Sequence, residues 1–119
     1  MCQRAVRFDR WIYIRTYHDG YHLFPSQMLF DLGNDPHEQF NLASQHPQIC
    51  QQAQAYLAEW HDEMMDSLNP PLDPLWVVMQ EGGPHHAKGQ LKHYCDSLAG
   101  TPRAWAIDEL RKRHPGEFV

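Results

Sequence analysis

The sequence holds nine histidines among 119 residues, and imidazole is the side chain that titrates near neutral pH and binds metal ions. His18 and His22 lie four positions apart, the spacing at which two side chains share one face of a helix. They flank Asp19-Gly20, however, and this dipeptide favours a turn because it tolerates positive φ. Outside a helix the spacing loses its geometric meaning, and the H-E-x-x-H motif is absent. We therefore predict that His18 and His22 lie in a loop and bind no metal.

A second pair, His85-His86, follows the loop-forming stretch Gly82-Gly83-Pro84. Two adjacent side chains on extended backbone point apart, whereas a zinc site needs three or four converging ligands. The three cysteines, Cys2, Cys50 and Cys95, are far apart, odd in number and without a C-x-x-C spacing. We predict free thiols, no disulfide framework and no metal ligands. Solvated imidazoles at helix ends or on polar faces are expected for His37, His46, His61 and His114.

Length and composition indicate one domain, residues 1–119, with a packed core, since 42% of the residues are hydrophobic and 12% aromatic. No run approaches the roughly 18 apolar residues of a membrane span. Ten Lys and Arg against 15 acidic residues leave no basic stripe for nucleic acid. The arginine-rich first 15 residues do not resemble a signal peptide. The chain as it stands is therefore expected in the cytoplasm, with its true compartment open.

These histidines must be positioned by the elements around them, and the first of these are β-strands. From residue 4 to residue 17 polar and apolar residues alternate with the period of two that strands show. Asp9-Arg10 is a candidate hairpin tip. A further strand is expected at 28–32, with Phe30 and Leu32 buried and Asp31 pointing outward, and Gly33-Asn34-Asp35-Pro36 ends it. The predicted core face contains Phe8, Ile12, Ile14, Phe30 and Leu32.

A helix is predicted over residues 47–68, with Pro47 in its first turn and Asn69-Pro70-Pro71 after its end. Apolar residues recur along it at spacings of three and four, which places one apolar stripe on the helix. That stripe includes Leu57, Trp60 and Met64, which we expect in the core.

Residues 73–119 combine a short strand and loop with terminal helices. The strand is expected at 73–79, the loop at 81–86, and helices at 90–98 and from Thr101-Pro102 to Arg113. Strands first and helices after predict an α+β fold. In it a small antiparallel sheet of three or four strands, with its turn motif over residues 4–43, packs against the helix 47–68, and additional helices follow.

Three segments resemble the C-terminal subdomain of the sulfatases, alkaline-phosphatase-like hydrolases with a formylglycine nucleophile. Residues 28–43, MLFDLGNDPHEQFNLA, are similar to the family signature e-L-Y-D-L-x-x-D-P-x-E-x-x-N-L-A at some ten positions. The hairpin 7–15, RFDRWIYIR, is similar to R-t-d-r-y-K-Y-I-r. The long helix, followed by Asp73-Pro74 and Trp76, resembles the heparan-N-sulfatase-like branch.

Departures from the family are as informative as the matches. Sulfatases need C/S-x-P-x-R for formylglycine, and none of the three cysteines is followed two positions later by Pro. The family's Asp-Asp and Asp-Asn or Asp-Gln metal ligands have no counterpart here. The resemblance therefore implies a part that is inactive alone, whereas calcium and formylglycine belong to a separate catalytic domain.

The resemblance implies a noncatalytic piece of a sulfuric ester hydrolase that completes the fold and borders the substrate cleft, with the sulfatase catalytic domain as its partner. His18, His22, His85 and His86 are the candidate cleft residues, because loop imidazoles can donate hydrogen bonds to a sulfated substrate. The alternative is a free-standing binding module. It would self-associate through exposed aromatic residues on the sheet face, Trp11, Tyr13 and Tyr17.

Overall fold

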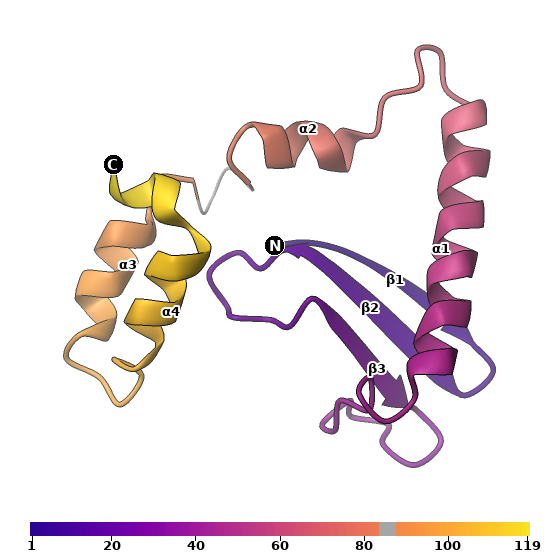
Figure 1. Ribbon diagram of the computed structural model, residues 1–119, viewed down its shortest axis with the longest axis horizontal. Helices are drawn as coiled ribbons and strands as arrows, with labels where there is room; N and C mark the ends of the chain where they lie inside the picture. Colours follow the sequence, from indigo (N-terminus) through magenta and orange to yellow (C-terminus); the bar gives the residue numbers. More distant parts are fainter. Residues whose placement is uncertain (84–87) are drawn as a thin grey trace. The chain divides into compact units, whose positions relative to one another are not determined.

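The computed structural model describes residues 1–83 and 88–119 (Figure 1). It confirms the predicted α+β class: a three-stranded antiparallel sheet contacts a long helix, and three further helices follow. The elements are β1 (Cys2–Phe8), β2 (Trp11–His18), β3 (Gln27–Asp31), α1 (Pro47–Asp66), α2 (Pro74–Gln80), α3 (Leu91–Leu98), α4 (Ala106–Arg113) and the 3₁₀ turn η1 (Pro115–Phe118). Within the described residues, no helix is both long and apolar enough to cross a bilayer.

The chain divides into two compact units. The sheet unit comprises Gln3–Tyr17 and Pro25–Pro74, and the helical unit comprises Met1–Cys2, His18–Phe24 and Leu75–Val119. The loop between β2 and β3 therefore belongs to the helical unit, although both strands belong mainly to the sheet unit.

In the sheet unit the strands lie in the order β1-β2-β3, and Tyr13 of β2 pairs with Leu29 of β3. One sheet face packs on α1 through a core of Tyr13, Leu29, Ala43, Cys50 and Ala53. Tyr13 and Leu29 are completely buried. Burial of a side chain as large as Leu or Phe contributes about 1.5–3 kcal/mol, so this face is what holds α1 on the sheet.

The prediction that Tyr13 is exposed on an aromatic sheet face is wrong. A single alternation from residue 4 to residue 17 puts the even positions of both strands on the same face. The hairpin tip, Asp9-Arg10, has two residues, however, so the even positions of β1 share a face with the odd positions of β2. Val6 and Phe8 accordingly pack with Trp11 and Tyr13 in one cluster. The residues proposed for self-association are therefore partly covered by α1.

Three further core expectations fail for identifiable reasons. Asp31 is buried, not outward, because it pairs with Trp11 and shares the face of Leu29 that packs on α1. The Arg10 guanidinium binds both its carboxylate oxygens, at 2.6 Å and 2.5 Å. Trp60 and Met64 are exposed, and the buried residues of α1, Cys50 and Ala53, lie in its first two turns. Phe30 is buried as predicted.

Segment 73–79 is helical, not extended: α2 begins at Pro74. Its apolar run suggested a strand, but Asp73 directly before Pro74 is also a helix start, since Asp is a favoured cap and Pro is tolerated in the first turn.

The helical unit packs α3 and α4 around Leu91, Cys95, Leu98, Ala106 and Leu110, together with Tyr21 from the β2–β3 loop. The helix α3 lies where it was predicted. The last helix begins at Ala106, not at Thr101-Pro102, which form turns before it, and η1 follows at Pro115.

Candidate functional site

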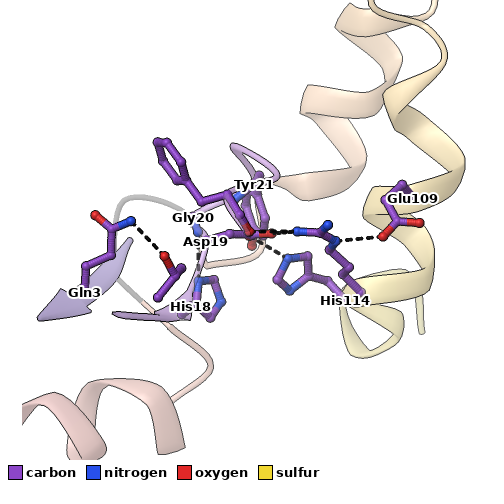
Figure 2. Close-up of polar contacts among 10 residues, drawn as sticks. Gln3, His18, Asp19, Gly20, Tyr21, Glu109 and His114 are labelled. Atoms are coloured by element: carbon purple, nitrogen blue, oxygen red, sulfur yellow. Dashed lines mark hydrogen bonds and ion pairs between the residues drawn. The ribbon is translucent and has the colours of Figure 1, made fainter. Parts of the chain in front are cut away.

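The candidate site is the loop His18–Phe24 together with the end of α4, all within the helical unit (Figure 2). Its centre is Asp19, which is only 6% exposed. One carboxylate oxygen, Oδ1, accepts hydrogen bonds from the Tyr21 backbone N–H at 2.9 Å and pairs with His114 Nε2 at 2.9 Å. The other, Oδ2, accepts from the Arg113 guanidinium at 3.1 Å. A single carboxylate thus ties the loop to the end of α4.

Electrostatics at Asp19 favour the charged carboxylate. Burial by itself raises the pKa of Asp19, but the hydrogen bonds from Tyr21 N–H, Arg113 and His114 outweigh burial and leave this pKa below its usual value. Arg113 also pairs with Glu109 at 2.9 Å, one helical turn earlier, and donates to the Phe24 carbonyl at 3.1 Å. Arg113 therefore holds both the carboxylate and the far end of the loop.

The backbone of the loop His18–Phe24 is strained, although Asp19 ties this loop firmly to the end of α4. Tyr21 and Leu23 adopt positive φ of 69° and 58°, a conformation that costs a bulky residue of order 1–3 kcal/mol. Gly20 also has positive φ, and a Cβ there would lie 2.7 Å from the Met1 nitrogen. Strained conformations persist where surrounding contacts over-determine them, and such positions concentrate at functional sites.

His18 is fixed at the entrance to this loop. Its Nδ1 accepts a hydrogen bond from the Gly20 backbone N–H at 3.0 Å (Figure 2), so the neutral ring carries its proton on Nε2. Burial, followed by the charge of nearby His114, lowers the pKa of His18. The His18 and His114 rings lie 5.0 Å apart, and the Gly83 backbone is so close to the His18 ring that a Cβ on Gly83 would clash with it.

Tyr21 is buried and lies in one cluster with His18, Asp19 and His114. Its ring meets the His114 ring edge-on at 5.1 Å. Burial and then the negative charge of Glu117 raise the pKa of Tyr21 to about 12, so the phenol remains neutral over the physiological range.

The predicted cleft histidines have different positions. His18 belongs to the cluster, but His22 is exposed and its ring contacts Phe24 at 5.8 Å. The other two, His85 and His86, lie outside the described residues. The expectation of solvated rings for His61 and His114 is wrong, since His114 pairs with Asp19 and His61 pairs with the buried Asp73 at 3.1 Å.

Sequence reasoning missed Asp19, Arg113 and His114 as a set. The basic run at the end of α4 was interpreted as compensation of the helix dipole. The separation of 95 residues between Asp19 and His114 leaves no local signal for their pairing.

The residues around Asp19 can donate hydrogen bonds to an anion. Asp19 and His114 also resemble a carboxylate–imidazole pair of the kind that serves as general base. Among the hydrogen bonds of the described residues, however, none joins His114 to a Ser, Thr or Cys that could act as a nucleophile. Within the same residues, no group of three or more His, Cys, Asp or Glu is placed to hold a metal ion.

No known protein-family model matches the chain, and no solved structure matches it.

Proposed function

We propose that this chain is the noncatalytic C-terminal part of a sulfatase-type sulfuric ester hydrolase, which completes the larger enzyme's fold and borders its substrate cleft. The observation that carries the proposal is segment 28–43, with its resemblance to the sulfatase signature. In that segment the two aspartates and the asparagine of the signature accept hydrogen bonds from backbone N–H groups.

The aspartates and the asparagine of the signature have separate structural tasks. Asp31 accepts from the Gly33 backbone N–H and from Arg10. Asp35 accepts from the Phe40 N–H at 2.8 Å, which closes the loop. Asn41 Oδ1 accepts from the backbone N–H groups of Leu29 at 3.0 Å and Ala43 at 3.1 Å, which joins β3 to the approach to α1. Such tasks support a role for this motif in building the fold, because each residue satisfies backbone groups.

A border of the cleft needs a fixed hydrogen-bond donor toward an anionic substrate, and His18 supplies one. Its Nδ1 accepts from the Gly20 N–H, so the neutral ring carries its proton on Nε2, the ring atom that lies closest to the Gly83 backbone. A lowered pKa keeps His18 neutral at pH 7. In this role His18 positions a sulfate oxygen by hydrogen bonding and takes no part in bond cleavage.

The chain's own residues fit neither the formylglycine nor the calcium ion that sulfatases use for catalysis. All three cysteines are buried, and none has Pro two positions later. Among the described residues no cluster of carboxylates is placed for calcium. In this proposal both groups belong to the catalytic domain.

The experiment begins with the genomic DNA directly upstream. An open reading frame encoding C/S-x-P-x-R and the family's Asp pairs is expected, and the complete protein is expected to hydrolyse an aryl sulfate. Within that protein, His18→Asn retains an acceptor for the Gly20 N–H but removes the Nε2 donor. A lost hydrogen bond to a charged group costs about 1.5–3 kcal/mol, so kcat/KM should fall roughly ten- to hundredfold.

The control is His37→Ala, an exposed histidine in the 33–40 turn, which should leave kcat/KM unchanged. An upstream sequence without the nucleophile motif, or a complete protein without sulfatase activity, overturns the proposal. Equal activity of His18→Asn and wild type overturns the role of His18 alone.

A further inference from the structure

A groove in the sheet unit follows the free edge of the sheet. The outermost strand is β1, and no strand of the described residues pairs with its other edge. The groove has a volume of about 460 Å³ and is lined by residues 4–7 of β1 and by Tyr56, Leu57 and Trp60 of α1. Unpaired N–H and C=O groups of an edge strand can bond to a further strand. One wall of the groove is therefore a template for strand addition, and the other wall is a helix.

Side chains of β1 alternate between the two faces of the sheet. Val6 packs against α1, and the Arg4 guanidinium lies 5.3 Å from the centre of the Trp60 ring. The even positions of β1 therefore face α1, and Ala5 and Arg7 direct their side chains to the opposite face. Since Ala5 and Arg7 nevertheless line the groove, they line it through their main chain.

The hairpin indicates which main-chain groups of β1 are free. Its tip has two residues, 9–10, and the first of them has a positive φ of 48°, as in a type II′ turn. In such a turn the residue before the tip bonds to the residue after it, and inward and outward main-chain groups then alternate along the strand. Counting back from Phe8, the N–H and C=O groups of Arg7 and Ala5 point away from β2. They are thus available to another strand.

The helix side of the groove presents aromatic rings that are exposed and yet held in place. Trp60 is 45% exposed and Tyr56 is 39% exposed. Phe8 meets the Tyr56 ring edge-on at 5.2 Å, and Gln52 donates to the Tyr56 hydroxyl at 2.9 Å. Rings that are fixed before binding lose little conformational entropy on contact with a ligand. This wall therefore suits apolar side chains that project from an added strand.

Charges differ between the two faces of the sheet at this edge. On the face that packs on α1, Arg4 is paired with the buried Asp73 at 2.6 Å. The second half of α1 carries four acidic residues and no Lys or Arg: Glu59, Asp62, Glu63 and Asp66. On the opposite face Arg7 is exposed, and it forms no ion pair with a described residue. An added strand is therefore complementary when its apolar side chains face α1 and its acidic side chains face the side of Arg7.

Pairing of β1 with β1 of a second copy does not provide this complementarity. The strand, CQRAVRF, contains two arginines and no acidic residue. Opposite charges directly across two strands stabilise the pair, and like charges destabilise it. In every register of β1 against itself, Arg7 would remain without an opposite charge.

We propose that β1 and α1 form a docking site for an extended segment of a partner protein in which apolar and acidic residues alternate. The segment adds a strand beside β1 through main-chain hydrogen bonds, as in other cases of peptide recognition at a sheet edge. Its apolar side chains lie on Tyr56 and Trp60, and an acidic side chain pairs with Arg7 across the two strands. This inference goes beyond the sulfatase assignment and does not depend on it.

The test titrates the full chain with three peptides, each acetylated and amidated, and follows binding by calorimetry and by the indole N–H signal of Trp60. The peptide EVELEVE has the required alternation, KVKLKVK reverses its charges, and EEVLVEE has its composition without the alternation. EVELEVE is expected to bind, and the other two at least fivefold more weakly, although the net charge of −5 by itself attracts the basic peptide. Trp60→Ala should weaken binding of EVELEVE at least tenfold, and Arg7→Glu should reverse the preference between EVELEVE and KVKLKVK.

Main-chain bonding is tested on the peptide, so that folding of the protein is not at issue. EVELEVE is N-methylated either at its Glu residues or at its Val and Leu residues. Only one of these two sets of N–H groups can face β1, so one methylated form should lose binding at least tenfold and the other should keep it. Matched controls come from the helical unit: Trp105→Ala, which is 69% exposed, and Arg103→Glu, also exposed, should bind EVELEVE as wild type does.

Four outcomes overturn the proposal. They are no binding of EVELEVE, equal binding of the three peptides, equal effects of the two N-methylated forms, and a dimer of the chain that Trp60→Ala dissociates, which would assign the groove to a second copy. Because no sulfatase activity is measured, each result is independent of whether the upstream frame encodes a catalytic domain.

Discussion

Asp19→Asn should loosen the helical unit selectively. Asparagine keeps the Oδ1 acceptor for the Tyr21 N–H but places an NH₂ group against the Arg113 guanidinium, where Asp19 now presents an oxygen at 3.1 Å. A hydrogen bond to a charged group contributes about 1.5–3 kcal/mol. Arg113 has 33% of its side chain exposed, so water replaces part of the lost contact. We therefore expect a loss of about 1.5–2 kcal/mol.

The assay is native-state amide hydrogen exchange, because it resolves the two units separately. The amide of Leu110, buried in the helical core, should lose about 10- to 30-fold of its protection, since roughly 1.4 kcal/mol is a factor of ten. The amide of Leu29 in the sheet unit should keep its protection. Asp96→Asn, an exposed position on α3, is the matched control and should change neither amide.

The sign of the pH dependence gives a second check on Asp19. A carboxylate whose pKa is lowered by folding stabilises the fold above its unfolded pKa, about 3.9, and loses this contribution as pH falls through the folded pKa. The difference between wild type and Asp19→Asn should therefore be full at pH 6 and vanish at strongly acid pH. A difference that persists in acid, or a control that lowers Leu110 protection equally, refutes the reasoning.

Three other predictions concern the loop and the turn motif. His18 has a lowered pKa, so the helical unit should lose stability as pH falls below the unfolded value of about 6.5, and His18→Asn should remove that loss when measured by exchange against pH. Asn41→Ala removes the acceptor for two backbone N–H groups and should destabilise the sheet unit by about 1–3 kcal/mol in urea, whereas Asn41→Asp retains most of that stability. Gly20→Ala should destabilise the helical unit by about 1 kcal/mol or more, because φ is positive and the Cβ meets Met1, whereas Gly100→Ala has open space and should not.

Each of these predictions has an outcome that contradicts it. A pH profile of His18→Asn identical to that of wild type would remove His18 as the cause. Equal stability of the alanine and aspartate variants at position 41 would show that its oxygen is not the relevant acceptor. Equal effects of the two glycine substitutions would mean that backbone conformation at Gly20 does not matter.

Local patterns predicted the elements well where one physical signal acted alone. The apolar stripe and Pro47 located α1, and the alternation located β1, β2 and β3. They failed where two signals competed. In segment 73–79 the prediction followed the apolar run, which suggests a strand. The structure follows the Asp73-Pro74 pair, which starts a helix. At the hairpin the alternation was correct on each strand, but the two-residue tip exchanged the faces, so Tyr13 was assigned to solvent.

The candidate site was less accessible to sequence reasoning than the fold. The Asp19-Gly20 turn predicted the loop that holds His18, because turn chemistry is local. The residues that fix this loop, Arg113 and His114, lie more than 90 positions away. One sequence carries no periodicity or spacing that relates positions so distant, and ion pairing of Asp19 depends on the packing of α4, which local rules do not specify.

The distance between Asp19 and His114 along the chain also sets an order of events during synthesis. A ribosome adds about 5–20 residues per second, so roughly 5–20 s separate Asp19 from the residue 95 positions later that binds it. During that interval the sheet unit, which ends at Pro74, can already pair its strands and dock α1. Tyr21, buried once α3 and α4 are present, meanwhile lacks its cover and is available to chaperones. A mutation at Arg113 or His114 is therefore expected to act late, on a nascent chain whose first half has already folded.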